Sequence, residues 1–320
     1  MREQIFTFGQ YLHRKFGVKI SKVPVSISGF TCPNIDGTVA KGGCTFCEND
    51  SFSPSLDHTR ELKGFFLNLH STSNPNLEKQ LQQLEWQFNA LSKRLQEEKR
   101  AEKYMVYFQS FTNTYAPFDT LKALYEKALS FENVVGLSIG TRSDSISDET
   151  FKYLAELSKQ TEIWIEFGIQ SIYDETLERI NRGHDSANVK EAILKAKLYG
   201  LNVCGHLIFG LPNESKEMML ETAKEAYSLG IDSVKYHPLY VVKRTALANE
   251  YARGEFEPIS ESLYCDVLRE ALLLKPSHVS VQRISAGIDD ESLIAPLWCK
   301  DKNEQIRKIN KSLELIGLKY

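Results

Sequence analysis

Short apolar runs alternate with longer stretches of helical periodicity along most of this chain. Each run is rich in β-branched or aromatic residues, which is typical of buried strands. The predicted strands are Val23–Phe30, Tyr104–Phe108, Val134–Ile139, Glu162–Ile169, Val203–Phe209 and Val234–Val242. Pro238 must stand at the end of the last strand, because proline cannot donate a hydrogen bond to a ladder.

Helical periodicity fills the intervals between these runs. Leucine or phenylalanine recurs at positions 77, 81, 84, 88, 91 and 95, which predicts a long amphipathic helix over Asn76–Lys99. Further helices are predicted at Asp119–Phe131, Ser147–Lys159, Tyr173–Asn181, Ala187–Tyr199 and Ser215–Leu229. Asp119 and Ser147 are the expected N-caps, and Gly200 and Gly230 are expected to close their helices.

Six strand-then-helix units therefore lie between about residue 23 and residue 255. This alternation predicts an α/β fold with a parallel sheet covered by helices. Six units are too few for the usual eight-stranded barrel, so we expect a partial (β/α)6 TIM-like barrel over residues 1–255. Residues 256–320 carry helix Ser260–Leu274, the apolar run His278–Ile284 and helix Asp301–Ile316. We expect a helical C-terminal extension packed on the same domain, because no linker-like stretch separates it.

Composition narrows the classes of protein without naming one. The chain has 320 residues, is 42% hydrophobic and 25% charged, and carries a formal net charge of −3. That charge predicts no strong field for nucleic acid over the whole surface, although one basic face stays possible. There is no signal-peptide pattern, and no run approaches the roughly 18 apolar residues of a membrane span. We therefore expect a cytoplasmic protein with free thiols and no membrane partner.

Three cysteines on one glycine-rich loop, Cys32, Cys44 and Cys47, form the most specific motif in the chain. Three thiolates can hold a [4Fe–4S] cluster and leave one iron open for another ligand. The alternative is a closed zinc site whose fourth ligand is His58, His70 or Cys204. The other cysteines, Cys204, Cys265 and Cys299, are expected to be small buried hydrophobic residues.

Polar residues stand at the carboxyl ends of all the predicted strands, where parallel α/β barrels carry their active sites. After the cysteine loop of the first strand, these residues are Gln109, Ser110, Thr112 and Asn113, then Arg142 and Asp144, then Glu166 and Gln170, then His206, and finally Lys235 and His237. Taken singly, each has a structural explanation: a capped turn, an Arg142–Asp144 ion pair, or a core histidine. Their occurrence at six strand ends in turn favours one shared site.

Glu166 raises a separate question, because it stands within an apolar strand. Strand alternation leaves open whether it faces the helices or the lumen. A buried carboxylate needs a cation, and Arg142 or Arg182 is the expected partner.

At these motifs the chain resembles radical SAM proteins of the bacterial YhcC/YtqA group. That group is similar to the catalytic subunit of elongator and to the coproporphyrinogen dehydrogenase branch. The resemblance covers nearly the whole chain. It runs through 29–38, 42–47, 107–109, 112–115, 141–142, 168–171, 181–184, 206–212 and 235–239, with Asn213 departing from an expected glycine.

The resemblance implies two cofactors, a [4Fe–4S] cluster and S-adenosylmethionine (SAM). It implies that Cys32, Cys44 and Cys47 are the metal ligands. It places the cofactor-binding residues at Phe46 near the adenine, at Gln109, Ser110, Thr112 and Asn113 near the amino group, at Gln170 and Arg182 near the carboxylate and ribose, and at Arg142, Glu166 and His206. Lys235 and His237 are the candidate catalytic residues, because with Arg244 they lie where substrate is expected.

The same resemblance suggests tRNA as a partner and an electron donor such as flavodoxin or ferredoxin. The expected reaction converts a carboxymethylaminomethyl group at C5 of a wobble uridine to aminomethyl. Candidate RNA contacts are Arg60, Lys63, His184, Lys243, Arg244 and Arg283, with Tyr236 and Tyr240 for base stacking. Two alternatives stay open: a radical SAM enzyme acting on a small molecule such as a tetrapyrrole, and a non-enzymatic, zinc-stabilised RNA-binding module.

Overall fold

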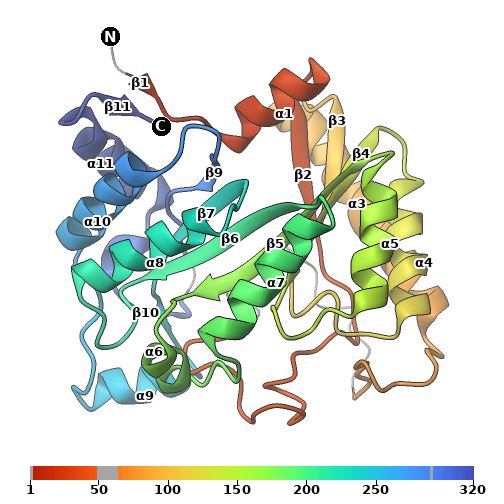
Figure 1. Cartoon of the computed structure of the whole chain (residues 1–320), viewed down its shortest axis with the longest axis horizontal. Helices are drawn as coiled ribbons and strands as arrows, with labels where there is room; N and C mark the ends of the chain where they lie inside the picture. The colour runs from red at the N-terminus through yellow and green to blue at the C-terminus, as the bar shows by residue number, and fades with distance from the viewer. Residues whose placement is uncertain (1–2, 49–63, 289–290) are drawn as a thin grey trace.

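A curled, all-parallel sheet of seven strands organises the computed structural model, which describes residues 3–48, 64–288 and 291–320 (Figure 1). The strand order is β2-β3-β4-β5-β6-β7-β9. The strands are β2 (Ile20–Val25), β3 (Lys103–Phe108), β4 (Val134–Thr141), β5 (Glu162–Gln170), β6 (Asn202–Phe209), β7 (Ser233–Pro238) and β9 (Ser280–Arg283). β2 and β9 are the two edge strands and do not pair with each other, so the barrel is partial, as predicted.

Helices cover the outer side of this sheet (Figure 1). They are α3 (Leu77–Lys99), α4 (Phe118–Leu129), α5 (Asp148–Ser158), α7 (Ser186–Leu198), α8 (Lys216–Ser228) and α10 (Glu261–Leu274). The short helix α6 (Asp174–Arg179) lies beyond the carboxyl end of β5 (Figure 1). Ser147 caps α5 as predicted, because its side chain accepts a hydrogen bond from Thr150 N. The Asp119 prediction is wrong: Pro117 holds the N-cap position of α4, and Asp119 lies in the first turn.

The strand pleat separates the core from the lumen. On β5, Ile165, Phe167 and Ile169 belong to the main hydrophobic core beneath the helices. Glu166, Gly168 and Gln170 alternate with them and line a central cavity. This alternation answers the question about Glu166, which faces the lumen.

The seventh strand and the helix that closes the barrel floor were not predicted. β9 comes from the apolar run after α10 and pairs with β7, so the C-terminal region extends the sheet. Helix α1 (Phe8–Phe16) brings Phe8 and Leu12 against Met105, Trp164 and Cys204. Cys204 thereby sits in an apolar cluster, as expected of a small buried residue.

Strand β2 ends at Val25, five residues before its predicted end, because side chains of α3 replace its next strand partner. Gln87 binds both backbone groups of Ser26, through Ser26 N to Oε1 (2.9 Å) and Nε2 to Ser26 O (2.7 Å). Gln83 and Gln80 bind the backbone of Ser28 in the same way. These three glutamines are buried on the inner face of α3. They satisfy backbone groups that would otherwise need a strand, and so release the chain into the cysteine loop.

Smaller elements complete the fold. β1 (Glu3–Gln4) pairs with β11 (Leu318–Lys319), and β8 (Val241–Val242) pairs with β10 (Leu293–Ala295). Helices α9 (Ala246–Ala252) and α11 (Lys302–Glu314) and the short 3₁₀ helix Leu297–Cys299 lie in the C-terminal half. Within the described ranges, no helix has both the length and the apolar character needed to cross a membrane.

Candidate active site

The three cysteines of the loop after β2 converge on one cavity at the carboxyl ends of the strands. Cys32, Cys44 and Cys47 all line it, and the cavity holds about 220 Å³. None of these cysteines is in a disulfide. Burial first, and then the neighbouring Cys44 and Cys32 thiolates, raise the pKa of Cys47 strongly. The Cys47 thiol is therefore a poor anion unless positive charge lies beside it.

Two asparagines hold the cysteine loop against the turn that follows α6. Asn34 Nδ2 donates to Asn181 O (2.6 Å) and Arg182 O (2.9 Å). In return, Asn181 Nδ2 donates to Lys41 O (3.0 Å) and Gly43 O (2.7 Å). Gly183 has a positive φ of 77°, and a Cβ there would meet Asn34 Oδ1 at 2.5 Å. The close approach of these two segments therefore requires glycine.

Two arginines, one directly after β4 and one in the turn after α6, lie beside the thiols. Arg142 Nη1 is 3.8 Å from Cys32 Sγ, and Arg182 Nη1 is 3.8 Å from Cys44 Sγ. Arg142 also makes a two-pronged ion pair with Asp144 (2.6 and 2.9 Å), which confirms that structural alternative. The arginines thus supply N–H donors and positive charge next to the sulfur atoms.

In this structure the three thiols are spaced more widely than the ligands of one zinc ion. Zinc–sulfur bonds of about 2.3 Å in a tetrahedron would place ligand sulfurs about 3.8 Å apart. The three Sγ atoms are not among the described His, Cys, Asp and Glu groups whose ligand atoms all meet within 4.8 Å. Of the proposed fourth ligands, His70 is exposed, Cys204 lies in the floor cluster, and His58 falls outside the described residues.

Most of the predicted site residues line this same cavity. Besides the three cysteines, they are Phe46, Gln109, Thr112, Arg142, Glu166, Gln170, Arg182, His206, Lys235 and His237. Ser110 and Asn113 are buried but do not line it. Asn113 Nδ2 instead binds Phe108 O (3.0 Å) and Gly140 O (2.9 Å), so it ties the ends of two strands together.

Unpartnered polar atoms mark the side of the cavity near Gln170. Gln170 has a φ of 65°, in the left-handed region that costs a side-chain-bearing residue about 1 kcal/mol or more. Its Oε1 and the Nε of Arg182 are buried without a hydrogen-bond partner among the described residues. A carbonyl acceptor and a guanidinium donor held this way suit a ligand that carries both an ammonium and a carboxylate.

A charged network lies deeper in the lumen; we call it the Glu166 network, made of Lys22, Ser138, Glu166, His206 and Lys235. Glu166 Oε1 accepts from Lys22 Nζ (2.5 Å) and Ser138 Oγ (2.5 Å). Its Oε2 accepts from His206 Nε2 (2.7 Å) and Lys235 Nζ. The expected partners Arg142 and Arg182 play no part in these bonds, because strands β2 and β7 bring lysines closer.

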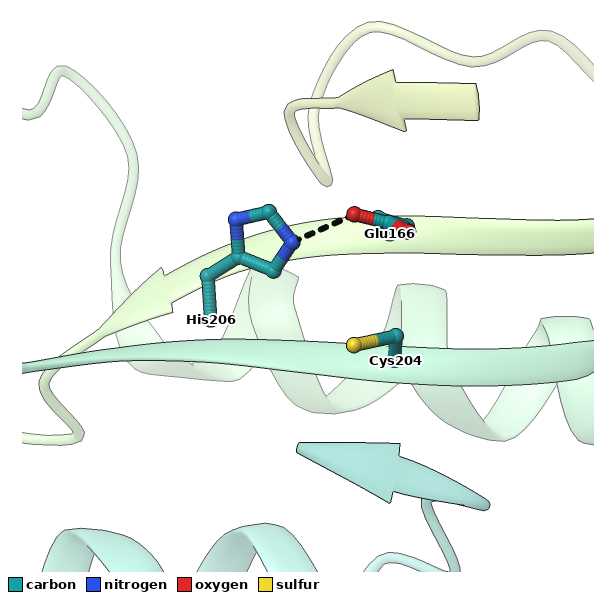
Figure 2. Close-up of side chains that lie close together, drawn as sticks. All are labelled: Glu166, Cys204 and His206. Atoms are coloured by element: carbon teal, nitrogen blue, oxygen red, sulfur yellow. Dashed lines mark hydrogen bonds and ion pairs between the residues drawn. The ribbon is translucent and has the colours of Figure 1, made fainter. Parts of the chain in front are cut away.

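The network sets the protonation of its members. Burial opposes ionisation of Glu166, but Lys22 and Lys235 outweigh it and hold the carboxyl pKa well below its ordinary value. Burial lowers the pKa of Lys22 to about 8, and burial with the Lys235 charge lowers that of His206 to about 4. At pH 7, His206 is therefore neutral and donates through Nε2, which leaves Nδ1 as an acceptor turned away from Glu166 (Figure 2).

Glu166, Cys204 and His206 lie close enough together to suggest a metal site (Figure 2). Their ligand atoms meet within 4.8 Å. Two lysine ammonium groups already occupy the carboxylate, however, and burial with the Glu166 charge raises the pKa of Cys204 to about 12. A protonated thiol beside two ammonium groups is a poor cation site, so we interpret these three residues as part of the lumen packing.

The structure separates the candidate RNA contacts. Tyr236 and Tyr240 are buried, and Tyr236 hydrogen-bonds Tyr227, so the expectation that they stack on bases is wrong. Lys243 and Arg244 are exposed, and Arg244 pairs with Glu48 at 3.1 Å. His184 is half-buried beside Ser143, and Arg283 lines the cavity. Arg60 and Lys63 fall outside the described residues.

Three important residues were given no role in the sequence analysis, although Tyr107 and Asn34 lie in runs that carry the family resemblance. Lys22 lies one residue before the predicted first strand, and a lone lysine beside an apolar run was its only signal. Tyr107 accepts a hydrogen bond from Lys235 Nζ at 3.1 Å, but it reads as one aromatic among several in its strand. Asn34 had no signal beyond its place in the cysteine loop.

Comparison with known proteins identifies the family. Residues 37–226 match the Radical SAM superfamily, and residues 231–314 match the Radical SAM C-terminal domain. The chain belongs to the radical SAM superfamily, whose enzymes use a [4Fe–4S] cluster and SAM.

Relatives place the chain more closely within that family. It is 37% identical to YtqA of Bacillus subtilis over 97% of this chain and 90% of that protein. It is 34% identical to YhcC of Escherichia coli K12, over 99% and 95% of the two chains. These matches confirm the resemblance to that bacterial group.

Proteins named for tRNA chemistry match in part. A tRNA uridine(34) acetyltransferase of Methanocaldococcus infernus is 34% identical over 48% of this chain and 29% of its own length. The structure of Elp3 from the same organism superposes with a TM-score of 0.59 at 21% identity. That superposition covers 93% of this chain and 64% of the Elp3 chain, and at this identity it shows the shared fold alone.

Proposed function

We propose that Cys32, Cys44 and Cys47 hold the [4Fe–4S] cluster of this radical SAM enzyme at the mouth of the barrel. The observation that carries the proposal is the convergence of three thiols and two arginines on one cavity. When bound, the cluster and SAM supply a 5′-deoxyadenosyl radical that removes a hydrogen atom from substrate. Arg142 and Arg182 offset the thiolate charge, and the Asn34–Asn181 contacts fix the loop.

The remaining cavity residues bind and orient SAM. Gln170 Oε1 accepts from its ammonium group, and Arg182 pairs with its carboxylate. Phe46 packs near the adenine, and Gln109 and Thr112 bind polar groups. His206 offers Nδ1 to a ribose hydroxyl, while Glu166 acts only through His206 because its oxygens are already taken. We assign Lys235 and His237, which line the same cavity, to contact with the substrate.

For the substrate, we propose a wobble uridine of tRNA, with conversion of the C5 carboxymethylaminomethyl group to aminomethyl. SAM would be the net oxidant, and water would cleave the oxidised C–N bond so that the two-carbon unit leaves as glyoxylate. Two things support this choice: the partial similarity to a tRNA uridine(34) acetyltransferase, and a fold shared with Elp3. A tetrapyrrole or other small molecule is the competing substrate. A flavodoxin or ferredoxin would supply the electron.

Iron content tests the proposed ligands. Anaerobic iron–sulfide reconstitution should give a brown protein with about four irons per chain, and dithionite should then release 5′-deoxyadenosine from SAM. Cys44→Ala should abolish both, whereas Cys265→Ala, a half-buried cysteine on α10 outside the cavity, should leave both intact. Stoichiometric zinc without SAM cleavage would overturn the assignment.

Mass spectrometry of tRNA nucleosides from a deletion strain tests the substrate. We expect 5-carboxymethylaminomethyl uridine to accumulate and its aminomethyl product to fall. Complementation with the wild-type gene should restore the profile, and complementation with Cys44→Ala should not. An unchanged wobble-uridine profile would remove tRNA and favour the small-molecule alternative.

A further inference from the structure

A second cavity opens at the gap between the two edge strands of the barrel. It measures about 820 Å³ and is lined by β2, β9, the end of α3 and the start of α11. It shares Tyr107, Gln109, Lys235 and Arg283 with the cysteine cavity. A group bound here would therefore lie next to the candidate reaction centre.

The lining of this second cavity is strongly cationic. Its charged residues are Lys22, Arg94, Glu98, Lys99, Lys235, Arg283 and Lys302. Glu98 pairs with Arg94 at 2.9 Å, and Lys22 and Lys235 are bound to Glu166. This leaves Lys99, Arg283 and Lys302, which we call the cation trio, without an ion-pair or hydrogen-bond partner among residues 3–48, 64–288 and 291–320.

The members of the cation trio repel one another. Partial desolvation lowers the pKa of Lys302, and the charges of Arg283 and Lys99 lower it further. Lys302 also begins α11, but the carboxylate of Asp301, which accepts hydrogen bonds from Asn303 N and Glu304 N at the start of that helix, does not line the cavity. Like charges gathered without a counter-ion destabilise a fold, unless a bound anion offsets them.

We propose that the cation trio is a phosphate-binding subsite, which holds a phosphate group of the substrate beside the reaction centre. The half-buried Arg283 guanidinium pairs with two phosphate oxygens, and the exposed Lys99 and Lys302 lie around them. This identification rests on the proposed function: if the substrate is tRNA, the group is a phosphodiester next to the target nucleotide. The subsite fits a phosphorylated small molecule equally well.

Calorimetric titration of the reconstituted full-length protein with pyrophosphate tests the subsite. We expect saturable binding that Arg283→Gln/Lys302→Gln weakens about tenfold or more. The matched control is Arg307→Gln/Lys311→Gln, which removes the same two charges from exposed positions that do not line the cavity and should bind like wild type. Succinate, a dicarboxylate, is titrated for comparison and should bind more weakly than pyrophosphate. Circular dichroism and thermal unfolding confirm that both variants fold.

A second titration uses an RNA hairpin with the tRNA anticodon sequence, at several salt concentrations. The Arg283→Gln/Lys302→Gln variant should lower the slope of log K against log salt by about 0.7 for each phosphate that it no longer neutralises. If pyrophosphate binds through the cation trio but the RNA hairpin does not bind, the phosphate subsite is supported and the tRNA proposal is overturned. Absence of pyrophosphate binding, equal losses in both double variants, or tighter binding of succinate would overturn the subsite.

Discussion

The Glu166 network and the cation trio both border the cavity between β2 and β9, the network through Lys22 and Lys235, but their charges are compensated differently. In the network, one buried carboxylate binds two lysines, a serine and a neutral histidine. In the cation trio, three positive side chains line one cavity with no acid bound to them among the described residues. Paired charges of the first kind fix the lumen. Unpaired charges of the second kind store an unfavourable interaction that an anionic ligand relieves.

Removing the centre of the network should have the largest effect. Glu166→Gln leaves Lys22 and Lys235 buried without a counter-charge, so we expect a loss of about 3–5 kcal/mol in the free energy of unfolding. Urea denaturation of the reconstituted protein measures it. Glu98→Gln breaks only an exposed pair with Arg94 and should cost under about 1 kcal/mol. If both variants lost the same free energy of unfolding, the Glu166 network would be no more important to stability than an exposed ion pair.

Acid should weaken the network next. Folding lowers the His206 pKa to about 4, whereas the unfolded chain binds a proton at about 6.5. Stability is therefore lost as pH falls from about 6.5 to about 4, by up to about 3 kcal/mol. Glu166 adds a further loss below its ordinary value of 4.5, because its folded pKa is depressed. Unfolding midpoints at pH 7 and pH 4.5 should differ less in His206→Gln. An identical difference would contradict a neutral His206.

Removing the Tyr107 hydroxyl should reduce stability less than either the Glu166→Gln substitution or acid. Tyr107→Phe removes the acceptor for Lys235 Nζ but leaves the Glu166 bond, so we expect a loss of about 1 kcal/mol. Thermal unfolding is the readout. Tyr153→Phe, which loses only a 3.4 Å bond on the surface, is the control and should change little.

Removing charges from the cation trio should change the stability least, and in the opposite direction. Without anions, Arg283→Gln/Lys302→Gln relieves repulsion and should raise stability by up to about 1 kcal/mol. Saturating pyrophosphate should stabilise the wild type and reverse the order, since only the wild type binds it. A lower melting temperature for the variant in anion-free buffer would show that the cation trio is held by contacts other than a ligand.

Local pattern was enough to predict most of the barrel. Apolar runs such as Glu162–Ile169 became strands, and serine caps such as Ser147 began helices where expected. These signals are local, because periodicity and capping depend on residues a few positions apart. The same reasoning missed the end of β2, where Gln83 and Gln87 of a distant helix replace a strand partner.

The sequence by itself determined the alternation of strand and helix, the cysteine loop and the polar strand ends, because each is written in neighbouring residues. Only the tertiary structure decided that Lys22 and Lys235 neutralise Glu166, that Asn34 joins Asn181, and that Arg283 stands beside Lys302. Those contacts join segments up to 147 positions apart, as Asn34 and Asn181 show. Which distant side chains meet is set by the curl and register of the sheet, and no local pattern contains that information.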